Sequence, residues 1–217
     1  MDERNKKFAD MIVNYSCSVQ PGERVLINEV GTTAKPLIKE IIRAVYKAGG
    51  HPFLGLSDAS LNREIIMQCN EAQLEYMRDY QLEQMKGMDA YIAVRASDNT
   101  SELSDVPSEK LNMYNKILRP VLDERVNNTK WAIMRYPNNS MAQLAGMSTE
   151  AFEDFYYDVC TLDYAKMSAA MDPLVELMNK TDKVRLVAPG TDLTFSIRDI
   201  PAIKCDGKYN IPDGEVY

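Results

Sequence analysis

Few residues of this chain have the types and spacing that catalysis requires. The sequence holds one histidine, His51, so it can form neither the two-histidine helix motif of a zinc protease nor a serine–histidine–aspartate relay. It has no phosphate-binding glycine loop, no dinucleotide-binding glycine motif and no Gly-x-Ser-x-Gly nucleophile turn. These absences argue against nucleotide-dependent enzymes and serine hydrolases, and they leave carboxylates as the main candidates for chemistry.

One group of carboxylates lies between residues 150 and 158. Glu150, Glu153, Asp154 and Asp158 recur at helical spacing and could share a cation. Acidic residues near the start of a helix also interact favourably with the helix dipole, and a solvated acidic face is the commoner origin of such a pattern. We therefore expect a surface helix here rather than a metal site.

A second candidate, Glu215, follows the turn sequence Pro212-Asp213-Gly214 and opens a β-prone run. Taken alone, this residue reads as an exposed strand carboxylate. Its sequence context gives it more weight.

Several segments carry a family resemblance, and the one that contains Glu215 is the most specific. These segments are residues 20–27 (QPGERVLI), 145–148 (AGMS) leading into 152–155 (FEDF), 189–193 (PGTDL) and 210–215 (NIPDGE). With them the chain resembles, over essentially its whole length, the M29 family of bacterial metallo-aminopeptidases, the thermophilic aminopeptidase group.

The resemblance implies an enzyme that removes N-terminal residues from peptides by means of two divalent metal ions of the zinc, cobalt or manganese type. It implies that Glu215 is the first metal ligand, because in this family the Glu of the Pro-x-Gly-Glu motif has that role. The other ligands (a Glu, two His and an Asp) and a catalytic Tyr would follow Tyr217. We therefore expect no catalytic residue within this chain, no activity and no bound metal for the chain alone. The resemblance also implies a homodimer.

The elements that must position Glu215 begin with an alternation of strands and helices. Predicted strands cover residues 24–28, 52–56, 90–94 and 131–134. Predicted helices cover residues 4–19, 34–45, 62–86 with a break near Asn70, 111–126 with a kink at Pro120, 150–160 and 162–179 with a bend at Pro173. This alternation predicts a Rossmann-like α/β layer architecture, with a mainly parallel sheet flanked by helices.

Two helix starts and one loop complete the prediction for this part of the chain. Thr32 or Thr33 is expected to cap the second helix, and Pro36 falls in its first turn, where a missing N–H costs little. Residues 136–147 read as irregular, and Ser148 or Thr149 caps the helix that follows.

The last part of the chain departs from the α/β pattern. Residues 184–187 and 193–197 alternate apolar and polar positions around Pro189-Gly190, which predicts a β-hairpin. We therefore divide the chain into an N-terminal α/β domain, residues 1–182, and the start of a truncated C-terminal metallopeptidase domain, residues 183–217. The chain stops two residues into the strand predicted after Gly214, which suggests that this second domain is cut.

Composition limits the partners and the compartment. The formal net charge of −7 argues against a nucleic-acid partner, since phosphate binding needs clustered Lys and Arg. No apolar run is long enough for a signal peptide or a membrane span. The four widely spaced cysteines form no Cys-x-x-Cys pair and are expected to be free thiols in a reducing cytoplasm.

Two other functions stay open from the residues alone. The chain could be a small-ligand binding module that uses the carboxyl edge of its sheet, with residues 28–33 and 95–100 as the lining. It could also be an oligomerisation domain without catalysis.

Overall fold

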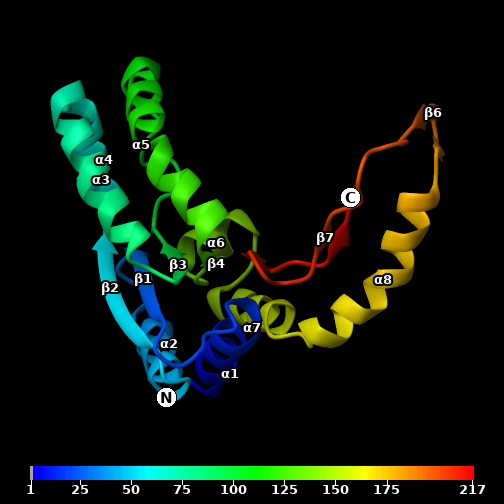
Figure 1. The fold of residues 1–217 in the computed structure, drawn as a ribbon, viewed down its shortest axis with the longest axis horizontal. Coiled ribbons are helices and arrows are strands. Elements are labelled where there is room, and N and C mark those ends of the chain that lie inside the picture. The colour runs from blue at the N-terminus through cyan, green and yellow to red at the C-terminus, as the bar shows by residue number, and fades with distance from the viewer. Residues whose placement is uncertain (1) are drawn as a thin grey trace.

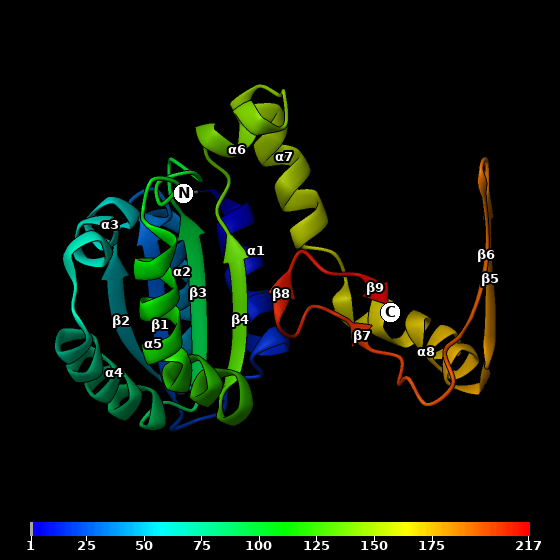
Figure 2. The ribbon, with the colours of Figure 1, turned by 90° about the horizontal axis from the view of Figure 1, so that it is seen from above.

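A five-stranded parallel sheet forms the centre of the protein. The computed structural model describes residues 2–217, and the strand order is β2 (His51–Ser57), β1 (Arg24–Gly31), β3 (Ala90–Ala96), β4 (Lys130–Arg135) and β8 (Asn210–Ile211). Every neighbouring pair runs parallel (Figures 1 and 2). The predicted α/β class with a parallel sheet is confirmed.

Alternate residues of the central strands bury opposite faces of the sheet. Val25, Ile27 and Ile92 point to the larger core cluster, whereas Leu26 and Tyr91 belong to a second cluster. Successive side chains of a strand point to opposite faces, so apolar residues at both parities indicate a sheet covered on both sides.

The larger cluster lies under three helices and a short π-helical turn. They are α1 (Glu3–Met11), the π-turn Ile12–Ser16, α2 (Lys35–Lys47) and α7 (Thr149–Cys160). Helix α2 carries the apolar stripe seen in the sequence, with Leu37, Ile41 and Val45 fully buried. The hydrophobic contacts of these helices fix the sheet face on which α1 and α7 lie.

The opposite face is covered by α4 (Glu71–Lys86) and α5 (Ser108–Asn128), and α3 (Ala59–Gln68) precedes α4. The predicted break near Asn70 is present, because Asn70 caps α4 by accepting a hydrogen bond from the Gln73 N–H at 2.9 Å. Pro120 lies inside α5, as expected.

The expected cap of α2 is wrong. Neither threonine caps this helix. Thr33 Oγ1 donates to the Ala96 carbonyl at 3.2 Å, and the buried carboxylate of Glu29 accepts from the Ala34 N–H at 3.1 Å. A carboxylate from the end of β1 therefore replaces the local side-chain cap that sequence proximity suggested.

A short helix, α6 (Asn139–Leu144), lies within the stretch expected to be irregular. Asn138 caps it by accepting from the Met141 N–H at 3.1 Å, and Ala142 is buried. One apolar anchor and one cap are too weak a pattern to predict a six-residue helix.

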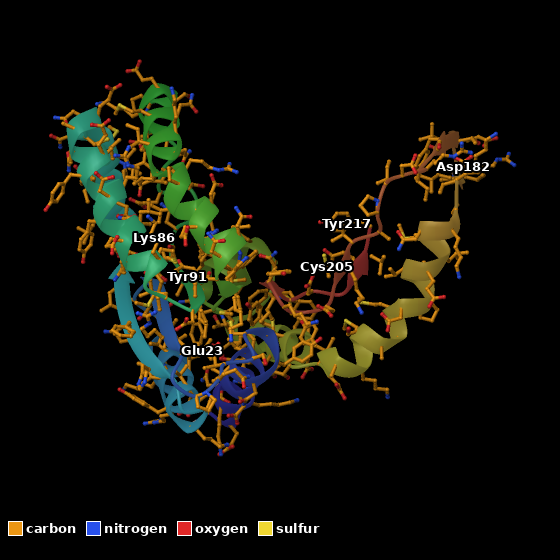
Figure 3. The ribbon with its side chains drawn as sticks, viewed as in Figure 1. Glu23, Lys86, Tyr91, Asp182, Cys205 and Tyr217 are labelled. Atoms are coloured by element: carbon orange, nitrogen blue, oxygen red, sulfur yellow. The ribbon has the colours of Figure 1, made fainter. Side chains whose placement is uncertain are left out.

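Beyond α7 the chain leaves the sheet. Helix α8 (Tyr164–Lys180) extends away from it and carries an antiparallel pair of strands, β5 (Lys183–Ala188) and β6 (Thr191–Ser196), at its far end (Figure 2). We call α8 together with β5 and β6 the arm. In Figure 3, Asp182 marks the far end of the arm, and Cys205 lies where the chain returns towards the sheet.

The returning segment adds two further pairings. Strand β7 (Lys204–Cys205) pairs antiparallel with β9 (Glu215–Val216), and β8, which lies between them in the chain, joins the sheet beside β4. Ile211 is buried in the main core, and Tyr209 packs on Trp131 with ring centroids 4.7 Å apart. Residues 204–217 thus contact the α/β layers directly, and the domain boundary at residue 182 stays a prediction.

In the described part of the chain, residues 2–217, no helix combines the length and apolarity needed to cross a membrane.

Candidate metal centre

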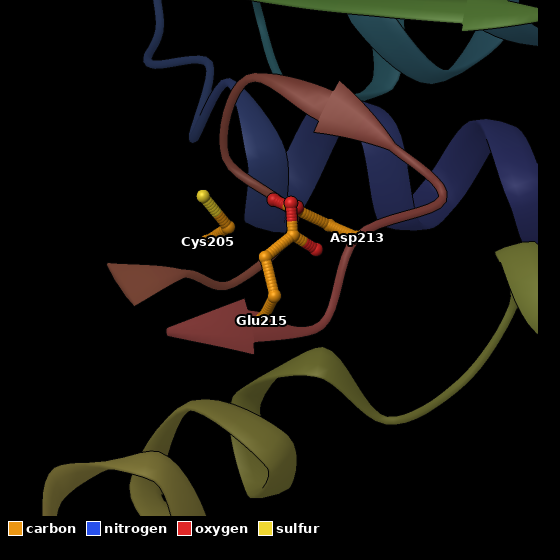
Figure 4. A group of neighbouring side chains, drawn as sticks. All are labelled: Cys205, Asp213 and Glu215. Carbon is orange, nitrogen blue, oxygen red and sulfur yellow. The ribbon is translucent and has the colours of Figure 1, made fainter. Parts of the chain in front are cut away.

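Three side chains that can bind a metal ion meet on the β7–β9 pair. Cys205 lies directly opposite Glu215 in the antiparallel register, and Asp213 comes from the turn that precedes β9. The Cys205 Sγ and one carboxylate oxygen from each acidic residue all lie within 4.8 Å of one another (Figure 4). Residues opposite each other in an antiparallel pair share one face, which explains how Cys205 and Glu215 come together.

The turn that carries Asp213 is fixed by contacts to Tyr164. The Asp213 N–H donates to the Tyr164 hydroxyl at 3.3 Å, and Asp213 Oδ2 accepts from the Gly207 N–H at 2.8 Å. Gly207 has φ +84°, and a Cβ there would lie 2.6 Å from the Tyr164 ring. The close approach of backbone and ring therefore requires glycine at this position.

A second set of hydrogen bonds holds the other turn of this segment. The Tyr15 hydroxyl donates to the Asp206 carbonyl at 2.9 Å, and Ser168 Oγ donates to Asp206 Oδ2 at 2.7 Å. Lys204 Nζ forms an ion pair with Asp172 at 2.7 Å. The paired strands are thus attached to the π-turn after α1 and to α8, from parts of the chain far away in sequence.

Negative charge dominates the electrostatics of this site. Partial burial raises the pKa of the Asp213 carboxyl, and the charge of Glu215 adds to the shift. The pKa of the Cys205 thiol is raised by desolvation and then by Asp213 and Glu215. A cation beside these groups would oppose the electrostatic part of both shifts.

The donor set fits a divalent ion. Two carboxylates and one thiol are ligand types found in zinc and cobalt sites, and the separations allow one ion to reach all three groups. Among residues 2–217, no other group of three or more His, Cys, Asp or Glu side chains is arranged to hold an ion.

The other residues considered in the sequence do not join this site. Arg4 forms ion pairs with Asp154 at 2.5 Å and with Glu153 at 3.5 Å, so part of the acidic face of α7 is neutralised by α1. The expectation of a surface helix there agrees with these contacts. His51 is exposed at the start of β2.

A small crevice lies at the carboxyl ends of β1 and β3, where the sheet order reverses direction. Its volume is about 200 Å³, and it is lined by Gly31, Thr32, Asp58, Ala59, Ser60, Ser97, Asp98, Asn99 and Glu102. Two of its carboxylates have local roles: Asp58 caps α3, and Glu102 accepts from Asn99. The crevice matches the place expected for a small-ligand site, and that function stays a prediction.

The sequence predicts Glu215 as a metal ligand, and that role stays a prediction. It does not single out the two neighbours in the cluster, because it indicates only a free thiol for Cys205 and only a turn for Asp213. A signal was present: Cys205-Asp206-Gly207 and Pro212-Asp213-Gly214 are two turn sequences close together, and antiparallel pairing of their flanks brings Cys205 opposite Glu215.

Comparisons with known proteins give the following matches. The family model described as thermophilic metalloprotease (M29) matches residues 1–217. Among solved structures, wild-type AmpT from Thermus thermophilus superposes with a TM-score of 0.74 at 18% sequence identity. The match covers 99% of this chain and 60% of the AmpT chain, so this chain spans about three fifths of that protein. No curated protein matched the chain.

Proposed function

Because the chain belongs to the thermophilic metalloprotease family M29, we propose that it supplies Glu215 as a ligand to the two-metal centre of an aminopeptidase. The observation that supports this proposal best is the meeting of Glu215 with Asp213 and Cys205 on one face of the β7–β9 pair. A family-specific motif and a cluster of metal-binding atoms thus coincide at the same residue.

The role of Glu215 in this proposal is electrostatic and positional. Bound divalent ions polarise a peptide carbonyl and make a hydroxide nucleophile available near neutral pH. Glu215 would hold one ion from strand β9, where the pairing with β7 fixes its backbone. Tyr164 and Gly207 would keep the preceding turn in place, so that the carboxylate does not depend on a free loop for its position.

We also propose that these 217 residues alone do not hydrolyse peptides. The donor cluster holds one thiol and two carboxylates, and the family resemblance assigns two His and two further carboxylate ligands to residues that this chain does not contain. The match to only 60% of AmpT agrees with a further part of the catalytic machinery outside these residues. The substrate would be the N-terminal end of a peptide, and the assembly would be a homodimer.

Hydrolysis of leucine p-nitroanilide tests the proposal in two arms. The 217-residue chain, supplied with cobalt or zinc, should release no p-nitroaniline above the chelator-treated control. The complete product of the gene should release it only with metal present, and Glu215→Gln should abolish the release.

Glu150→Gln provides the matched control, because Glu150 is an exposed carboxylate of α7 that the metal cluster does not include. It should leave hydrolysis unchanged. Full activity in the Glu215→Gln variant would overturn the assignment of Glu215. Chelator-sensitive hydrolysis by the 217 residues alone would overturn the proposed inactivity.

A further inference from the structure

We propose that Cys205 binds the metal ion together with Glu215 and Asp213, so that this chain alone forms a three-donor site for one thiophilic divalent cation. The inference rests on the proposed function, in which Glu215 is a metal ligand. It adds the sulfur ligand Cys205, which lies outside the motif of residues 210–215, it gives Asp213 of that motif a role as a ligand, and it assigns a metal preference. It also replaces the expectation from the sequence that the chain alone binds no metal.

Geometry is the first argument. Cys205 and Glu215 face each other across the β7–β9 pair, and the Cys205 Sγ lies within 4.8 Å of the carboxylate oxygens of Glu215 and Asp213. Bonds from zinc to its ligand atoms are about 2.0–2.3 Å long, so two donors on the same ion lie closer together than the sum of two such bonds. The three donor atoms of this cluster are close to that limit, and small side-chain rotations would bring them to one ion.

The surroundings of Cys205 are the second argument. The other three thiols, Cys17, Cys69 and Cys160, are buried, with at most 1% of their surface exposed. Cys205 is half-buried, and its Sγ lies within 4.8 Å of a carboxylate oxygen of Asp213 and of one of Glu215. A thiol at this position can lose its proton to solvent when the ion binds, which forms the thiolate–metal bond without an oxidant or reductant.

The backbone is the third argument. Both turns of the segment are held by contacts to other elements. The Tyr15 hydroxyl donates to the Asp206 carbonyl, the Asp213 N–H donates to the Tyr164 hydroxyl, and Gly207 packs closely against the Tyr164 ring. The backbone that carries the donor side chains is therefore already ordered, and an ion that binds has to order fewer groups.

Sulfur in the donor set gives the site a metal preference. Thiolates select zinc and cobalt over manganese and magnesium, which prefer oxygen ligands. Zinc and cobalt should therefore bind this chain more tightly than manganese does, and removal of the sulfur should reduce that difference.

Cobalt titration of the 217-residue chain tests the sulfur ligand directly. Bound cobalt should produce a near-ultraviolet sulfur-to-cobalt charge-transfer band in the natural chain and in Cys69→Ser, but not in Cys205→Ser. Zinc affinity should fall at least about tenfold in Cys205→Ser, because even the mutation of a residue that only hydrogen-bonds to a metal ligand lowers metal affinity by that much. Manganese affinity should change much less.

Alkylation of the native chain tests the site without a variant. Because the other three thiols are buried, iodoacetamide should modify Cys205 first, and zinc should slow that reaction. Glu215→Gln and Asp213→Asn should weaken the protection, and Glu150→Gln should not.

The outcomes separate this inference from the proposed function. Absence of cobalt binding, cobalt bound without the band, or a band that persists in Cys205→Ser would overturn the sulfur ligand. If the complete gene product still hydrolysed peptides with metal in any of these cases, the proposed function would stand without the sulfur ligand. If the charge-transfer band appeared but the complete gene product showed no metal-dependent hydrolysis, the three-donor site would stand and the aminopeptidase proposal would be overturned.

Discussion

The parallel sheet and the arm use similar apolar residues in opposite ways. In the central strand β3, Ile92 and Val94 are fully buried in the larger core cluster on one face of the sheet. In the arm, Leu186, Val187 and Leu193 leave half or more of their side chains exposed. Both regions contain regular strands, so backbone pairing alone does not decide how much a strand contributes to stability.

The difference shows which contacts hold each region. The sheet is stabilised by apolar burial on two faces, whereas β5 and β6 are held by their own ladder and by a bidentate pair of Arg185 with Asp192 at 2.8 Å. A two-stranded hairpin is marginally stable in water without a packed face. We therefore expect amide hydrogens of the arm to exchange through local opening, and those of β1 and β3 through global unfolding.

The largest expected effect is on the free energy of unfolding, when one buried and one exposed apolar strand residue are each replaced by alanine. Ile92→Ala should lower the free energy of unfolding by about 2–5 kcal/mol, because it leaves a cavity in a closed core. Leu193→Ala, at a residue with 51% exposure, should change it by about 0.5 kcal/mol or less. Urea denaturation followed by circular dichroism measures both, and equal losses would remove the distinction between the two regions.

A smaller loss of stability is expected when two glycines with left-handed backbone conformation are each replaced by alanine. Gly207→Ala should lower stability by about 1–3 kcal/mol, since the new Cβ would meet the Tyr164 ring in a strained backbone conformation. Gly190→Ala in the arm has a similar φ of +75° but nothing within 4 Å, so it should cost less. Thermal unfolding measures the difference, and a larger loss for Gly190→Ala would contradict the role of the ring contact.

The smallest effect concerns pH. Burial raises the pKa of Glu29 above its value in the unfolded chain. The folded state therefore retains the proton longer, and stability falls as pH rises from the unfolded pKa through the folded one. Glu29→Gln keeps an acceptor for the Ala34 N–H and should flatten this slope, whereas Glu75→Gln on the exposed face of α4 should not. Unfolding measured between pH 4 and 7 checks this, and an unchanged slope in Glu29→Gln would contradict it.

The sequence allowed most of the α/β layers to be predicted. Apolar periodicity located the four longer strands and the helices that cover them, and the polar Asn70 located the break between α3 and α4. Strand order was not accessible, because periodicity describes elements and not their neighbours. Strand β8 was missed for a related reason: Asn210–Ile211 is too short to show a period, and its partner β4 is distant in the chain.

The candidate site was predictable only in part. Glu215 can be proposed from the sequence because its motif resembles a family pattern, whereas Cys205 and Asp213 become its neighbours through the pairing register of two-residue strands. The Glu29 cap was missed because a residue in a strand supplies it. In each case a contact between separate elements decides the outcome, and local patterns carry little information about such contacts.

The pairing of β8 with β4 has a consequence for the order of assembly. The chain between these two strands includes α6, α7, α8 and the β5–β6 pair, so the pairing of β4 with β8 closes a long loop. The chain loses conformational entropy when this loop closes, and it does so before the contacts of β8 can compensate for the loss. The units β1–α2–β2 and β3–α5–β4 close much shorter loops. We therefore expect the last strand of the sheet to dock late in folding, and the turns on either side of it, with Cys205, Asp213 and Glu215, to become ordered at that same late step.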